Sequence, residues 1–261
     1  MPQCLTLCLF SYANNNLKNL KGQSVQCYDS QILLHAAFNQ LFASSMGNTL
    51  VPVLIEICKS THRLAVLADY EIASRDHAKL NNAALLLQES YSKSYSDRKE
   101  LQPNAPYDND GSKKAAVLFI VNELFRIYFR LNTLRLCKNV AKPTEAKKLH
   151  ELGTMGQMVT YKYFSGRLCL FEDNFIAAEE HLEYAYNNCP NNAIHNKHCI
   201  LRYLIPIKLY RGKLPTIQLL QEYKLVEFIN VVDSIRKGDL RVFNDALLEY
   251  QHLFIRYVIF C

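Results

Sequence analysis

The sequence predicts an all-α protein made of antiparallel helical hairpins that stack as a repeat. The 261-residue chain holds only 8 Gly and 8 Pro, which is too few for the turns of a many-stranded β fold. Apolar residues recur at helical spacing over most of its length, and no alternating run is long enough for a confident strand. A third observation is a tetratricopeptide-type spacing of small and large residues between Gly166 and Pro190.

The N-terminal part of the chain divides into a segment without a clear secondary-structure signal and a segment predicted to be helical. Residues 1–30 are poorly defined, with loop signals at 14–16 and 21–24. From Gln31 apolar residues follow a helical period, and three runs up to Tyr91 predict N-terminal helices over 31–91 joined by short turns.

The polar stretch 92–112 contains two prolines and an Asp-Asn-Asp-Gly cluster. Such a composition buries little apolar surface, so this stretch is predicted to be a linker and the domain boundary. The region 113–261 then begins with a strongly amphipathic helix over 113–131, and Lys142-Pro143 is expected to close the helix that follows.

The first hairpin of the repeat is predicted between Gly166 and Pro190. Small residues would let two helices approach closely, and large ones would fill the seam between them. Asp173-Asn174 would form the turn, and Asn174 could cap the second helix. The positions that carry the repeat are Gly166, Phe175, Ala178, Leu182, Ala185 and Pro190.

Two further hairpins carry weaker signals. The first runs from Ile194 through Gly212 into a helix begun by 214–216. The second runs from Leu225 through Gly238 into a helix that Asp239 would cap. Three consecutive hairpins are enough for a helical solenoid. The apolar residues 250–261 either dock on the last hairpin or mark a truncated chain, and truncation is favoured.

Charge and cysteine content narrow the functional classes. The formal charge of +6 suits a polyanion or an acidic protein, but it does not mark a dedicated nucleic-acid binder. Nine cysteines without paired spacing indicate a reducing compartment.

Catalytic and metal-binding motifs are weak in this sequence. It contains no glycine-rich phosphate loop, nucleophile elbow, paired CxxC or HExxH. Zinc ligands are conceivable at Cys189, His195, His198 and Cys199, but the spacing is poor, so no metal or cofactor is expected. Glu179, Glu180 and Glu183 are interpreted as a solvated helix face rather than as catalytic carboxylates.

Basic residues interleaved with tyrosines are the strongest candidates for a binding site. A strip of this composition can hold phosphates and stack bases, while the alternative is a solubilising face with its tyrosines in the core. The candidate contacts for nucleic acid or an acidic partner are Lys162, Arg167, Lys197, Arg202, Lys208, Arg211 and Lys213.

Two regions resemble one known family, 113–136 and 159–259, including the stretches VTYKYFSGRLCLF and RYLIPIKLYRGKLPT. They are similar to the PCI-domain protein two family, the PCI subunit of the nuclear transcription–export complex for mRNA. The resemblance implies a right-handed superhelix of tetratricopeptide-like hairpins closed by a winged helix. The chain stops before any winged helix, which carries much of that family's partner and nucleic-acid surface.

The resemblance also implies a function. Its members are non-enzymatic scaffolds at the nuclear pore, with some cytoplasmic presence conceivable. The expected partners are a large scaffold subunit and a small acidic disordered subunit shared with the proteasome lid. RNA or DNA is a further expected ligand, with its binding weakened by the lack of a winged helix. No membrane or small-molecule substrate is expected. The alternatives are a PCI subunit of the proteasome lid, the COP9 signalosome or a translation-initiation complex, and an enzyme on a helical scaffold.

Overall fold

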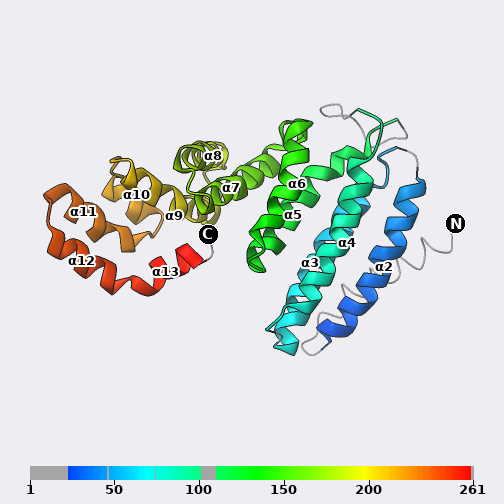
Figure 1. The fold of residues 1–261 in the computed structure, drawn as a ribbon, viewed down its shortest axis with the longest axis horizontal. Coiled ribbons are helices and arrows are strands. Elements are labelled where there is room, and N and C mark those ends of the chain that lie inside the picture. Colours follow the sequence, from blue (N-terminus) through cyan, green and yellow to red (C-terminus); the bar gives the residue numbers. More distant parts are fainter. Residues whose placement is uncertain (1–22, 46, 74, 101–109, 260–261) are drawn as a thin grey trace. The chain divides into compact units, whose positions relative to one another are not determined.

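The computed structural model describes residues 23–45, 47–73, 75–100 and 110–259. Within these ranges all regular structure is helical, with twelve α-helices, short 3-10 turns and no strand (Figure 1). The all-α prediction is confirmed. In the same ranges no helix combines the length and the apolar character that crossing a membrane requires.

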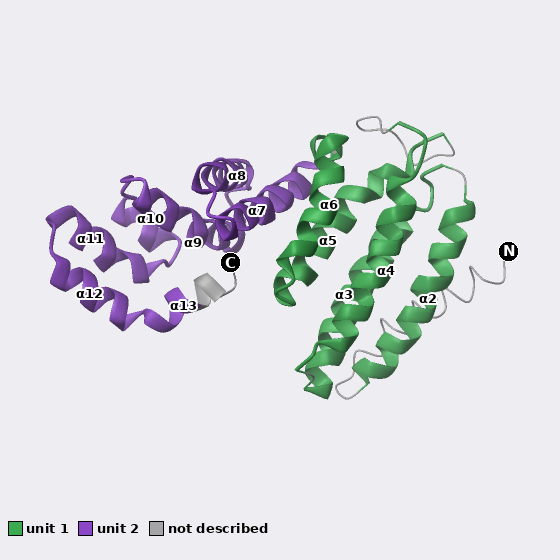
Figure 2. Cartoon of the chain, in the orientation of Figure 1, with its two compact units in different colours: residues 1–153 green, residues 154–261 purple. Residues whose placement is uncertain are grey.

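The chain forms two compact units, residues 1–153 and 154–261 (Figure 2). The first unit contains helices α2 (Ser24–Ser44), α3 (Val51–Ile72), α4 (Ala78–Tyr95), α5 (Val117–Arg130) and α6 (Leu134–Ala146). Its core is formed mainly by the facing sides of α3, α4 and α5, on which Leu54, Leu87 and Leu124 are fully buried.

Helix α2 begins at Ser24, earlier than the sequence predicted. The reason is that its first turns already bury large side chains against other helices. Tyr28 is fully buried, and its hydroxyl donates to the Lys79 carbonyl oxygen at 2.5 Å. The rest of the segment 1–30, up to residue 22, lies outside the described residues.

The predicted linker 92–112 lies inside the first unit, and the division falls after Gly153 instead. Its first residues, Ser92–Tyr95, complete helix α4. Beyond that helix, Asp97 accepts hydrogen bonds from the Ser112 hydroxyl at 3.0 Å and the Lys113 amide at 2.7 Å. Asp97 therefore connects the two ends of this stretch. Residues 101–109 lie outside the described part.

Pro143 does not close its helix as predicted, because α6 continues to Ala146. Proline removes one backbone donor, but its own carbonyl still accepts from the Lys147 amide at 3.3 Å. Thr144 is fully buried and its hydroxyl donates to the Val140 carbonyl at 2.7 Å. Packing of this last turn compensates for the missing donor.

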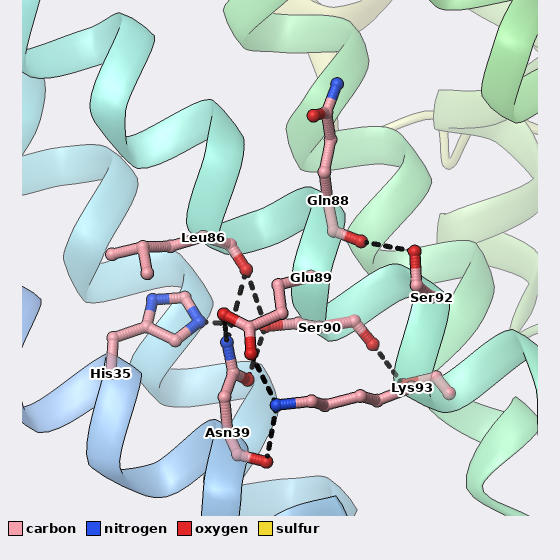
Figure 3. A network of polar contacts seen from close by, with 9 residues as sticks. His35, Asn39, Leu86, Gln88, Glu89, Ser90, Ser92 and Lys93 are labelled. Carbon is pink, nitrogen blue, oxygen red and sulfur yellow. Dashed lines mark hydrogen bonds and ion pairs between the residues drawn. The ribbon is translucent and has the colours of Figure 1, made fainter.

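A buried polar network joins α2, α3 and α4. The two ring nitrogens of His35 lie 2.9 Å from the hydroxyl oxygens of Thr61 and Ser90. Ser90 also donates to Asn39 Oδ1 at 2.8 Å, and Figure 3 shows His35, Asn39 and Ser90 together. All four side chains are fully buried, and burial lowers the pKa of His35 to about 4. A neutral ring can donate from one nitrogen and accept at the other, so both hydroxyl contacts are satisfied.

The N-terminus of α4 is capped by a residue of the preceding helix. Asp69 of α3 is buried, and its two carboxylate oxygens accept from the backbone amides of Lys79 at 3.0 Å and Leu80 at 2.9 Å. The position before the helix, His77, has a left-handed backbone and makes no side-chain cap. Two of the free amides at this helix end are thus satisfied by the last turn of α3.

The second unit contains α7 (Met155–Phe171), α8 (Phe175–Asn188), α9 (Ile194–Tyr210), α10 (Ile217–Glu222), α11 (Ile229–Lys237), α12 (Leu240–Glu249) and α13 (Gln251–Ile259). Helices α7 and α8 form the predicted hairpin. Ala178, Leu182 and Ala185 are fully buried in its seam. A Cβ on Gly166 would lie 2.7 Å from Leu182 Cγ, so the close approach of the two helices depends on this glycine.

The other repeat positions lie where the turns require them. Asn174 accepts from the Ala177 amide and Asp239 from the amides of Arg241 and Val242, as N-caps. Phe175 is half-buried at the start of α8 and Pro190 follows its end. Gly212 and Gly238 have left-handed backbones, with φ of 74° and 70°.

Two details of the later hairpins differ from the prediction. The segment 214–216 precedes helix α10, which starts at Ile217 because the Thr216 side chain caps it. The segment from Leu225 begins as a 3-10 turn, Val226–Phe228, before α11. Past α12, the ring of Phe254 packs edge-on against Phe228 with 5.6 Å between centroids, as the docking alternative expected.

Candidate functional site

The predicted basic strip lies on two helices and one loop of the second unit. Helix α7 carries Lys162 and Arg167, helix α9 carries Lys197, Arg202 and Lys208, and the loop after α9 carries Arg211 and Lys213. The structure brings only part of this set together as a surface.

Arg167 and Lys197 are buried, so their prediction as surface contacts was wrong. The Arg167 guanidinium lies 4.6 Å from the Tyr203 ring centroid and 5.5 Å from that of Tyr163. Lys197 Nζ donates to Asn191 Oδ1 at 2.6 Å and lies 4.9 Å from the Tyr186 ring. Cation–π contacts let both long side chains enter the core between helices with their charge stabilised.

Lys208, Arg211 and Lys213 lie together at the end of α9, where they meet carboxylates of α8. Lys213 Nζ lies 2.8 Å from Glu179 Oε1, and Arg211 binds the second oxygen of the same carboxylate. The Glu179 side chain is only 3% exposed, against 39% for Arg211 and 56% for Lys213. The hydrogen bond from Lys213, together with that from Arg211, holds the pKa of Glu179 below its usual range.

Lys208 makes a parallel contact one turn along. Its Nζ lies 2.6 Å from Glu183 Oε1, and both side chains remain partly in solvent. The interpretation of Glu179, Glu180 and Glu183 as a solvated face therefore holds for Glu180, which is exposed, and was wrong for Glu179. The carboxylates fix the loop after α9 onto α8, and they neutralise part of the basic strip.

The two remaining basic residues are half-buried and lie near histidines. Lys162 Nζ lies 3.3 Å from His181 Nδ1, and Arg202 Nη2 lies 2.9 Å from His198 Nε2. Of the interleaved tyrosines, Tyr203 is in the core and Tyr210 is 74% exposed. The strip thus presents cations and one free aromatic face, in the kind of arrangement that can attract an acidic ligand.

The four residues weighed as zinc ligands do not converge. His198 Nδ1 contacts the Tyr223 carbonyl oxygen at 2.7 Å, while Cys199 Sγ lies 3.8 Å from His195 Nε2. Burial raises the pKa of both Cys189 and Cys199, which disfavours the thiolate that zinc requires. Across the described residues, no three His, Cys, Asp or Glu side chains gather as a metal site would need.

The sequence reasoning missed the role of Glu179, although a signal was present. Glu179 is four residues after Phe175 and three before Leu182, so it shares their face of the helix. A carboxylate on a seam-facing position needs a cation partner. The basic residues 32 and 34 positions later supply it.

Comparison with known proteins identifies proteins similar to this chain. No family model matches it. It is 34% identical over 241 residues to PCI domain-containing protein 2 of Xenopus laevis, covering 90% of this chain and 59% of that protein. It is 32% identical over 258 residues to the protein of the same name from Danio rerio, covering 97% and 61%. The Dictyostelium discoideum homolog is 38% identical over 204 residues, covering 74% and 46%. The chain thus spans about half to three fifths of the length of these curated relatives.

Proposed function

Since the chain belongs to the PCI domain-containing protein 2 family, we propose that it acts as a non-enzymatic scaffold subunit of a nuclear mRNA-export complex. In this proposal its helical hairpins hold a large scaffold subunit and a small acidic subunit at the nuclear pore. RNA or DNA is a further ligand of the assembled complex.

Family membership is the observation that carries the proposal. The match extends over 90% of the chain in the Xenopus relative and includes both compact units. Lys208 and Lys213 of the basic strip are partly exposed, but each is paired with a carboxylate of α8, so the scaffold proposal does not rest on them.

Affinity purification of the chain from nuclei, followed by mass spectrometry, tests the proposal. We expect the large export scaffold, the small acidic subunit and pore proteins to co-elute. Recovery of proteasome-lid, signalosome or initiation-factor subunits instead would contradict the export proposal and favour a scaffold role in one of those complexes. That alternative has one specific observation in its favour, a 33% identity over 195 residues to a protein named CSN12 homolog from Neurospora crassa.

Nucleic-acid binding is a separate part of the proposal with its own test. Reversing the charge of Lys208 or Arg211 would set like charges against Glu183 and Glu179, so neutral variants are more informative. We expect Lys208→Gln to weaken binding of single-stranded RNA and to lower the log–log salt slope by about 0.7 per lost phosphate contact.

The matched control is Lys59→Gln, which also removes a lysine paired with a glutamate, Glu56, on the surface of the first unit. Fluorescence anisotropy at four salt concentrations measures both quantities. If the two variants bind RNA equally well and with equal slopes, Lys208 has no role in binding.

A further inference from the structure

A second surface of the same unit has a different character from the basic strip. Three large apolar side chains lie at one end of the first hairpins: Phe171 at the end of α7, Ile176 in the first turn of α8 and Tyr210 at the end of α9. They are 58%, 63% and 74% exposed. Exposed apolar groups that gather at one place indicate an interaction surface, whereas scattered ones are ordinary.

The antiparallel order of the helices places these residues together. The end of α7, the start of α8 and the end of α9 all lie at the same end of the stack. The half-buried ring of Phe175 at the start of α8 contacts Tyr210 at the end of α9, with 4.9 Å between the ring centroids. We call the set Phe171, Phe175, Ile176 and Tyr210 the aromatic end.

The backbone under the aromatic end is well fixed. Between α7 and α8, the Asn174 amide donates to the Cys169 carbonyl at 2.9 Å, and Asp173 has a left-handed φ of 57°. After α9, the Lys213 amide donates to the Lys208 carbonyl at 2.7 Å, and the two cations of this loop bind the buried Glu179. A surface fixed in this way loses little conformational entropy when it binds.

Charge around the aromatic end indicates what kind of partner fits. Glu172, Asp173 and Glu180 are exposed beside it. The cations of the adjoining loop are already engaged, since Arg211 and Lys213 bind Glu179 and Lys208 binds Glu183. The chain as a whole carries a formal charge of +6, so an acidic rim here is a local exception to its basic character.

We propose that the aromatic end is a docking surface for a peptide segment with apolar anchors flanked by lysine or arginine. Its anchors would cover Phe171, Ile176 and Tyr210, and its cations would lie over Asp173 and Glu180. This surface borders the basic strip and shares Tyr210 with it, but the proposal does not depend on export or on RNA binding.

Selection from a random peptide library tests the proposal, because the selection requires no named partner protein. The immobilised full-length chain is the target, and the double variant Phe171→Ser/Ile176→Ser is used for counter-selection. We expect the retained peptides to carry Leu or aromatic anchors and at least two Lys or Arg. Retained peptides without a basic bias, or no difference between chain and variant, would overturn it.

The strongest selected peptide then allows a quantitative test by fluorescence anisotropy. Loss of the two anchors should weaken its binding at least about tenfold, as for central apolar contacts in other interfaces. Asp173→Lys/Glu180→Lys should weaken peptide binding more at low salt than at high salt. The proposal fails if either double variant binds the peptide as tightly as the unchanged chain.

A matched control is available on two of the same helices, α7 and α9. Met155 at the start of α7 and Ile194 at the start of α9 are 52% and 59% exposed, at the opposite end of the stack. Met155→Ser/Ile194→Ser removes comparable apolar surface and should leave peptide binding unchanged. A loss as large as that of the first double variant would show that binding is not specific to the aromatic end.

Discussion

The buried carboxylate of Glu179 shows how one residue can organise a loop. It is on α8, while both of its cations come from the loop that follows α9. A buried charge without a partner lowers the free energy of unfolding far more than an exposed one. The position of the loop after α9 is therefore coupled to the ionisation of the Glu179 carboxylate.

Removal of both cations should destabilise the fold, because the buried Glu179 carboxylate would lose its partners. We expect Arg211→Gln/Lys213→Gln to lower the unfolding free energy by about 1–2 kcal/mol, below the roughly 3–5 kcal/mol of fully buried pairs because both cations are partly solvated. Urea denaturation followed by circular dichroism measures the change. Adding Glu179→Gln to the double variant should restore part of the loss, and no restoration would contradict the explanation.

The same carboxylate predicts a pH dependence. Its pKa is held below the usual range in the folded chain, so its contribution is present above about pH 4.3, the unfolded value, and is lost as the pH falls through the folded pKa. The fall in stability between pH 5 and 3 should therefore be smaller in Glu179→Gln than in the unchanged chain.

His35 should act on stability in a higher pH range. Burial lowers its pKa to about 4, against about 6.5 for an unfolded histidine. Below pH 6.5 the unfolded chain binds a proton that the folded chain does not, so stability falls by about 3 kcal/mol on going from pH 7 to 4. Urea titrations give the unfolding free energy at each pH. The loss of unfolding free energy between pH 7 and 4 should be smaller in His35→Gln than in the unchanged chain, by this amount. Equal pH dependence would show that His35 does not titrate as inferred.

At the scale of elements, the first hairpin depends on how closely α7 and α8 approach. The two glycines of α7 provide a matched pair. A Cβ at Gly166 would lie 2.7 Å from Leu182 Cγ and 3.3 Å from the Ala178 carbonyl oxygen, whereas a Cβ at Gly156 would meet nothing within 4 Å.

Alanine at these two glycines should therefore have opposite effects. Gly166→Ala is expected to cost about 1–3 kcal/mol through overpacking. Gly156→Ala is expected to gain up to about 1 kcal/mol through helix propensity. Thermal denaturation of the two variants compares them directly, and a loss at both positions would contradict the packing argument.

Helices were the part of the fold that the sequence predicted well, because their signals are local. Apolar spacing found α9 at its observed bounds, and the caps at Asn174 and Asp239 follow from residue type alone. The burial of Arg167 and Lys197 could not be predicted, since it depends on aromatic rings from other turns and helices. The polar network around His35 was missed for the same reason, because its hydroxyl partners come from α3 and α4.

At the scale of the whole molecule, the main finding is that the chain divides after Gly153. Each unit has its own core: the first is centred on α3, α4 and α5, and the second is built from residues of α7 to α11. The polar composition of 92–112 suggested an earlier boundary, but Asp97 connects that stretch to the start of the next helical segment.

Separate cores predict separate folding. We expect residues 1–153 and 154–261, expressed as two fragments, each to give a helical circular dichroism spectrum and a cooperative urea transition. A fragment that is unfolded in the absence of the other would show that the division is one of contacts only. In the full chain, Gly166→Ala should destabilise the second unit and leave the unfolding of the first unit unchanged.

The cap that Asp69 supplies to α4 has a consequence for how the chain is made. Asp69 precedes Lys79 by ten residues, so the ribosome delivers the capping carboxylate before the helix that needs it. A peptide of residues 78–95 alone lacks this acceptor, so its first turn would fray.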